Sequence, residues 1–114
     1  MTVDDRRHTQ LARNEALYRT VNERIEGLTE ALSPEPQSMS AVCECADESC
    51  TEVIEVSIED YEAVRGNPTL FIAAPGHENL EIEVVTQRHE AFVVVCKNKS
   101  EGREVAIATD PRSG

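Results

Sequence analysis

The sequence predicts an α+β fold, in which a long N-terminal helix packs with a small, mostly antiparallel sheet and one short helix. Three observations predict it. Residues 4–32 repeat their seam positions at alternating steps of three and four, the period of an amphipathic helix. Several segments after residue 50 alternate apolar and polar side chains, as strands do. Three of the four cysteines lie between Cys43 and Cys50, and clustered thiols in so short a chain favour a metal-stabilised core.

The long helix is expected over residues 4–32, and its stripe has two interpretations. The stripe packs on the protein's own sheet, or it forms a two-stranded self-association seam in which Asn14 fixes the register. Residues 33–38 contain two prolines, which end a helix and stiffen a linker. The stripe consists of Leu11, Asn14, Tyr18, Val21, Ile25, Leu28 and Leu32.

A short helix is expected in the middle of the chain. Residues 51–57 alternate and predict the strand that precedes it. Ser57 can cap the helix, with Asp60 at the third helical position. Gly66 suits the position just past the helix end, and a proline follows it.

The remaining chain predicts further strands. Residues 69–74 form an apolar segment that Pro75-Gly76-His77 ends sharply. Residues 80–86 and 91–97 predict a hairpin with its turn between them. Residues 104–109 are expected to form a last strand or a helical turn. In the first hairpin strand, one face is expected to carry Leu80, Ile82, Val84 and Thr86, and the other Glu81, Glu83 and Val85.

The cysteine stretch is the segment with clear metal-binding chemistry, because thiolates and imidazoles are the ligands of closed tetrahedral zinc sites. One loop can supply three ligands, Cys43, Cys45 and Cys50. The candidates for a fourth are His77, Cys96 and His89. We favour His77, because it follows a turn at a strand end and its ring can reach a neighbouring loop. Cys96 lies in an apolar run, where a small buried thiol is ordinary.

Other interpretations of the cysteine stretch stay open. A set of three cysteines and one histidine can also hold an iron–sulfur cluster in place of Zn²⁺. Without any metal, Cys43 or Cys45 could act as a redox switch, although acidic neighbours raise the pKa of a thiol and disfavour a reactive thiolate. A zinc ion with three protein ligands and an open water position would suit a hydrolase.

Several short segments also carry a resemblance. They are Arg13-Asn14-Glu15, residues 21–25, the Cys43–Cys50 stretch, residues 61–65, Pro75-Gly76-His77-Glu78, Arg88-His89 and Asp110-Pro111-Arg112. Across residues 13 to 112 the chain resembles a family of small uncharacterised actinobacterial proteins. In that family the three-cysteine stretch and the Pro-Gly-His turn occur together, which implies one site formed by Cys43, Cys45, Cys50 and His77. Its members carry an acidic residue where this chain has Cys96, and the family implies no activity.

The charge distribution limits the partners. The formal net charge is −11, and residues 43–62 hold eight acidic side chains without a lysine or arginine. Such a surface repels nucleic acid and anionic lipid, so we expect neither as a partner. Residues 1–10 contain no apolar run, and no segment has the roughly 20 apolar residues of a membrane helix. We therefore expect a cytoplasmic protein whose thiols stay reduced.

Together these features predict a small cytoplasmic zinc-binding protein with a structural Cys3His site, serving as a protein-interaction or regulatory module. The expected partner is a protein, or a second copy bound through the N-terminal helix. The alternatives are an iron–sulfur or thiol redox sensor and a zinc-dependent hydrolase. Enzyme activity is the less favoured reading, because no phosphate loop, nucleophile elbow or zincin helix is present. The expected organisation is an N-terminal helix (1–32), a linker (33–40) and a zinc-binding α+β domain (41–112).

Overall fold

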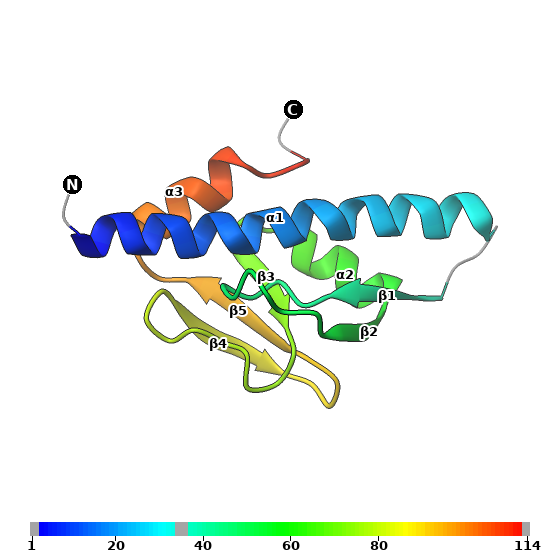
Figure 1. Ribbon diagram of the computed structural model, residues 1–114. Coiled ribbons are helices and arrows are strands. Elements are labelled where there is room, and N and C mark those ends of the chain that lie inside the picture. Colours follow the sequence, from blue (N-terminus) through cyan, green and yellow to red (C-terminus); the bar gives the residue numbers. More distant parts are fainter. Residues whose placement is uncertain (1–2, 34–36, 113–114) are drawn as a thin grey trace.

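The computed structural model describes residues 3–33 and 37–112. Its elements confirm the predicted α+β class (Figure 1). In chain order they are α1 (Val3–Leu32), β1 (Ser38–Val42), β2 (Val53–Ser57), α2 (Ile58–Arg65), β3 (Leu70–Ala73), β4 (Glu83–Arg88), β5 (Val93–Lys97) and α3 (Ser100–Ala108).

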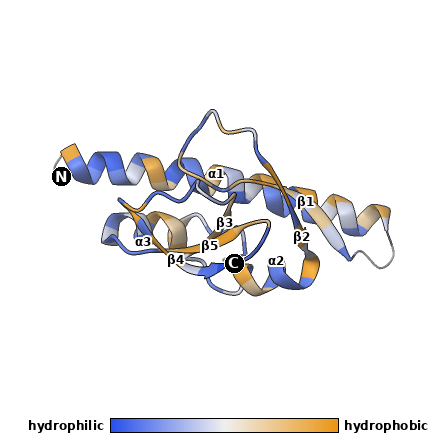
Figure 2. Ribbon diagram, turned by 90° about the horizontal axis from the view of Figure 1, so that it is seen from below, coloured by the Kyte–Doolittle hydropathy of each residue, from blue (hydrophilic) through white to orange (hydrophobic). Residues whose placement is uncertain are grey.

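The strands form two antiparallel sheets. One is the two-stranded β1–β2 hairpin, and the other has the order β3-β5-β4. Helix α1 runs along one side of both sheets, with α3 beside it (Figure 1). The core between these layers includes Phe71, Ile72, Val94 and Val95, all fully buried. Figure 2 shows β5 as largely hydrophobic, whereas hydrophobic and hydrophilic segments alternate along α1.

The long helix is confirmed within the described residues, but only part of the expected packing stripe faces the protein. Ile25 packs against the core, and Leu11, Asn14 and Tyr18 are half-buried. Leu28 and Leu32 are 63% and 86% exposed. The buried residues of the helix are displaced around it and are mostly polar: Ala12, Glu15, Ala16, Arg19, Asn22 and Glu26. We call this set the inner face of α1. It is buried because its charged groups meet complementary groups elsewhere in the chain, a pairing that helical periodicity does not reveal.

The centre of that pairing is a buried lysine. The Lys97 ammonium contacts the carboxylates of both Glu15 and Glu83, lying 2.7 Å from Glu83 Oε1, and all three side chains are inaccessible to solvent. Lys97 Nζ and the Arg19 guanidinium also approach the Phe71 ring, at 5.0 and 4.6 Å from its centroid. Burial lowers the pKa of Lys97 to about 7 and raises the pKa of Glu83 to about 7, because desolvation disfavours each charge.

This lysine also explains the register of β4. The sequence placed Val84 with Ile82 on one face and Glu83 on the other. The structure buries both Ile82 and Glu83, whereas Val84 is 46% exposed. Glu83 turns inward because Lys97 lies directly opposite it in the β4–β5 ladder. A bulge between Val85 and Gln87 then shifts the pairing of the rest of the strand.

The predicted start of the short helix is confirmed in α2, but its end differs from the prediction. The Ser57 hydroxyl accepts a hydrogen bond from the Asp60 backbone N–H at 3.0 Å, as an N-cap does. Gly66 is the C-cap residue of α2, and its φ of −63° is right-handed. It therefore does not occupy the left-handed position expected for a glycine past the helix end.

The expected linker differs from the sequence interpretation. Strand β1 begins at Ser38, inside the expected linker, and Met39 and Ala41 pair with Val56 and Ile54 on a buried face. The alternation of serine with apolar residues was the available signal. Residues 34–36 of the expected linker, and residues 1–2 of the expected helical segment, lie outside the described residues. The last segment, expected as a strand or a helical turn, is helical and belongs to α3.

A pH-dependent stability is expected from Glu26, which is 5% exposed on the inner face of α1. Burial, aided by the neighbouring carboxylate of Glu62, raises the pKa of Glu26 to about 7. Such a group contributes stability below its unfolded pKa of 4.5 and loses that contribution as the pH rises through 7. Glu26→Gln should therefore be more stable than the parent by about 1–3 kcal/mol at pH 8, and little different at pH 4.5. Urea denaturation at both pH values checks this, and an equal effect at both would contradict it.

Candidate metal centre

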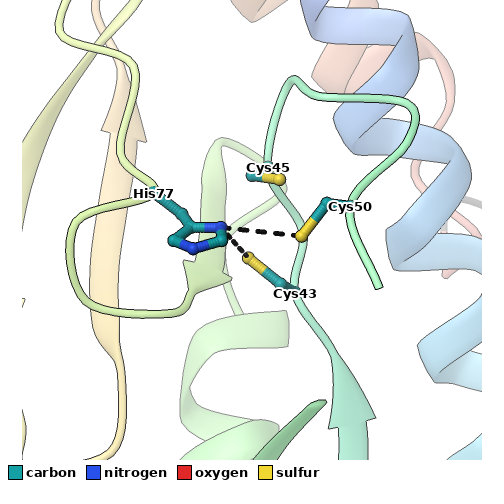
Figure 3. A group of neighbouring side chains, drawn as sticks. All are labelled: Cys43, Cys45, Cys50 and His77. Carbon is teal, nitrogen blue, oxygen red and sulfur yellow. Dashed lines mark hydrogen bonds between the residues drawn. The ribbon is translucent and has the colours of Figure 1, made fainter. Parts of the chain in front are cut away.

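Two loops bring the predicted ligands together. The first connects β1 to β2 and carries Cys43, Cys45 and Cys50, and the second follows β3 and carries His77. The three sulfur atoms gather around the imidazole ring (Figure 3). One ligand atom from each of the four residues lies within 4.8 Å of the others. The chain therefore forms a Cys3His group that is geometrically able to bind a metal ion.

The distances within the group suit one tetrahedral ion. His77 Nδ1 lies 3.5 Å from Cys50 Sγ and 3.8 Å from Cys43 Sγ. Zinc binds thiolate at about 2.3 Å and imidazole at about 2.0 Å, so tetrahedral angles separate sulfur from nitrogen by roughly 3.6 Å. The side chains thus lie near the spacing that a single ion requires, with Nδ1 as the histidine donor.

The turn after β3 positions His77. The His77 backbone N–H donates to the Ala74 carbonyl at 2.9 Å, which closes a turn with Pro75 and Gly76 at its centre. Gly76 has a φ of +88°, as the third residue of a type II turn requires. The Ala74 backbone N–H also donates to Cys43 Sγ at 3.1 Å. This bond joins the two loops directly, and a hydrogen bond to sulfur favours the thiolate form that a metal needs.

Glu44, which the sequence analysis did not identify, anchors the cysteine loop on the side opposite to the sulfur atoms. Glu44 lies between Cys43 and Cys45 and is fully buried. Its carboxylate accepts hydrogen bonds from Asn22 Nδ2 at 2.7 Å, Arg65 Nη2 at 3.0 Å and the Ile72 N–H at 3.1 Å. The available signal was alternation, because a residue between two ligands that share one side of an extended segment must point to the other side.

Helix α1 holds the far end of the same loop. The Tyr18 hydroxyl donates to the Glu48 carbonyl at 2.7 Å, and Asn14 Nδ2 donates to the Ala46 carbonyl at 2.9 Å. In the self-association interpretation Asn14 would fix the register of the seam, whereas here its amide bonds within the chain. Both residues therefore serve the cysteine loop, which explains the polar interruptions of the predicted stripe.

Two of the three thiols in the group, those of Cys43 and Cys45, are shielded from solvent rather than reactive. Cys43 and Cys45 are 1% and 2% exposed. Burial is the main cause that raises the pKa of each of these two thiols. A buried neutral thiol is a poor nucleophile and a poor target for oxidants. A bound cation would reverse this preference, because metal coordination deprotonates thiols.

The two alternative fourth ligands lie outside the Cys3His group. Cys96 pairs with Leu70 in the β3–β5 ladder, and its sulfur lies 3.6 Å from Thr69 Oγ1. His89 stacks on Phe92 with ring centroids 4.4 Å apart, and its Nε2 lies 2.9 Å from Gln87 Oε1. Each therefore has local partners of its own.

A second cluster, of three carboxylates, does not resemble a metal centre. One oxygen each from Glu26, Glu30 and Glu62 lies within 4.8 Å of the others. The Arg112 guanidinium already pairs with Glu26 at 3.0 Å and with Glu62. A cation is therefore in place, and it fastens the end of the described chain to α1 and α2.

Comparisons with known proteins leave the site to be judged on its geometry. No protein-family model matches the chain. Neither a curated protein nor a solved structure matches it. Among the described residues, no helix combines the length and apolar character needed to cross a membrane. The resemblance to the actinobacterial family stays a prediction.

Proposed function

We propose that this protein is a small zinc-binding protein-interaction or regulatory module of the cytoplasm, with a structural site formed by Cys43, Cys45, Cys50 and His77. The observation that carries the proposal is the convergence of these four donors from two loops, all within 4.8 Å of one another. The same four residues are the ones that the family resemblance implies, and membership of that family is part of the proposal.

A structural role is favoured over a catalytic one. Four protein donors complete the tetrahedron that zinc prefers, and they leave no position for a water or substrate. A small cavity of about 50 Å³ lies between α2 and the β4–β5 hairpin, and none of the four donors lines it. A hydrolase would need an open coordination position beside a cavity. The surface, rather than the metal, is then the working part of the module.

Zinc is favoured over an iron–sulfur cluster for a geometric reason. In a cluster the ligands bind different iron atoms and must surround a group of several atoms. Here the nitrogen of His77 lies 3.5 Å from the sulfur of Cys50, a spacing that suits two ligands of one ion. A cytoplasmic location also fits, because the reducing environment keeps such thiols available to a metal.

The proposal is tested by the metal content of the purified protein. We expect one zinc per chain by elemental analysis, and no visible absorption, because zinc has a filled d shell. The protein must be kept reduced throughout purification, because oxidised thiols do not bind the metal. A brown protein containing iron and sulfide would overturn zinc in favour of the cluster, and protein that binds no metal would overturn the site itself.

Ligand substitutions should separate His77 from its rivals. Loss of one of four ligands leaves water in its place and loosens the site, so His77→Ala should weaken zinc binding by about tenfold or more. His89→Ala and Cys96→Ala serve as matched controls and should change the affinity little. Competition with a chromogenic chelator measures all three. Intact affinity in the His77 variant, with loss in the Cys96 variant, would identify a different fourth ligand.

A further inference from the structure

The outer side of α1 is apolar and basic, opposite to the acidic character of the chain. A helix turns by about 100° per residue, so Leu17, Val21 and Leu28 fall on one stripe directly opposite the inner face. Arg6, Arg13 and Arg24 follow one flank of this stripe. We call these six residues the outer face of α1. All six acidic residues of the helix lie on the same side as the inner face: Asp4, Asp5, Glu15, Glu23, Glu26 and Glu30.

The outer face has no partner among the described residues. Leu17 and Leu28 are each 63% exposed, and Val21 is 37% exposed. Its three arginines make no hydrogen bond or ion pair within the described parts of the chain. The arginines that face the protein behave differently, since Arg19 donates to the Pro68 and Ala106 carbonyls. The polar inner face of the helix thus meets the rest of the chain, whereas the outer face is left exposed.

The charges exclude two of the possible occupants. A broad anionic membrane would also face the acidic remainder of the chain, whose net charge is −11, and that repulsion opposes adsorption. A single helix would instead contact the outer face alone, within the short screening distance of its arginines. A second copy packed antiparallel would bring one arginine flank against the other. Arg24 also lies beside the stripe between Val21 and Leu28, and a second outer face offers no carboxylate to pair with it.

We propose that the outer face of α1 is a docking surface for an acidic amphipathic helix of another protein. Such a helix would pack its apolar stripe on Leu17, Val21 and Leu28 while its carboxylates meet Arg6, Arg13 and Arg24. At 30 residues, α1 offers a surface about 45 Å long for this pairing. The proposal names the surface behind the proposed interaction role, and it does not depend on which metal the cysteine loop holds.

The probes are two synthetic helical peptides with the same leucine repeat, one flanked by glutamates and the other by lysines. Fluorescence anisotropy of labelled peptide measures binding to the full chain. We expect the acidic peptide to bind about tenfold tighter than the basic one, or more, and to weaken as salt rises, because exposed charges carry the preference.

Charge-matched variants locate the binding surface. Arg13→Glu combined with Arg24→Glu should weaken the acidic peptide by about tenfold or more and strengthen the basic one. Arg88→Glu combined with Lys99→Glu makes the same change in net charge at residues outside the outer face of α1 and should leave the preference in place. Leu17→Ser combined with Leu28→Ser should weaken the acidic peptide as well. All these side chains are exposed, so circular dichroism and metal content should match the parent.

Four results would overturn the proposal. They are equal binding of the two peptides, no binding of the acidic peptide, a dimer in sedimentation that Leu17→Ser with Leu28→Ser dissociates, and adsorption to phosphatidylserine vesicles that the same substitutions abolish. Failure here with zinc still bound would refute the docking surface and leave the metal centre standing. Loss of metal binding with peptide binding retained would refute the metal centre and leave the docking surface standing.

Discussion

Removal of the proposed zinc from the Cys3His group should destabilise the protein by about 5 kcal/mol or more, because the binding energy of a structural zinc adds to the folding energy. The lost binding energy would act on the β1–β2 hairpin, which is a weakly stable part of the fold. The β1–β2 hairpin is an isolated two-stranded sheet, which is marginal without outside support. The loop that connects β1 to β2 also anchors α1 through Tyr18 and Asn14. Metal removal should therefore destabilise the packing of that helix as well.

Thermal unfolding followed by circular dichroism, with and without a strong chelator, measures this effect. Cys45→Ser should reproduce it without chelator. Cys96→Ser is the matched control, because that thiol lies outside the metal group and the substitution changes the same atom. Chelated protein with an unchanged midpoint would contradict the structural role of the site.

Lys97→Met should destabilise the protein by about 3–5 kcal/mol at pH 7, because it leaves two buried carboxylates without their cation. Glu15 and Glu83 are both inaccessible to solvent, and Lys97 contacts each of them. Methionine keeps a similar apolar stem beside Phe71, so the charge is the main change. The effect should exceed that of most single substitutions, which cost about 0.5–3 kcal/mol.

The pH dependence distinguishes charge from packing. Burial already raises the pKa of Glu83 to about 7, above the value of 4.5 for the unfolded chain. The cost of the unpaired carboxylates should therefore be largest near pH 7. It should shrink as the pH falls toward 4.5, where the carboxylates protonate, and as it rises above 7, where Lys97 itself loses its charge. Urea denaturation of parent and variant across this range measures it. Lys99→Met, an exposed cation nearby, should change stability by less than about 0.5 kcal/mol, and a Lys97 variant with the same small effect would contradict the buried ion pairs.

Much of the candidate site could be predicted because its chemistry is local. The extent of α1 follows from its period, and the start of α2 follows from the capping hydroxyl of Ser57. Pro75 and Gly76 dictate a tight turn wherever they occur together, and that turn delivers His77 to the cysteine loop. Thiols spaced two and five residues apart converge within one loop. Each of these features depends on residues close in the sequence.

Only the tertiary structure decided which side of each element faces inward. The inner face of α1, the inward turn of Glu83 and the anchoring of Glu44 all depend on charged partners far along the chain: Lys97, Arg65 and Arg112. A periodic pattern ranks positions by their apolar character and treats a charged residue as exposed. In this protein the buried charges are paired, so their desolvation is offset by contacts that no local pattern contains. Leu17, Val21 and Leu28 of α1 were thereby left on the surface.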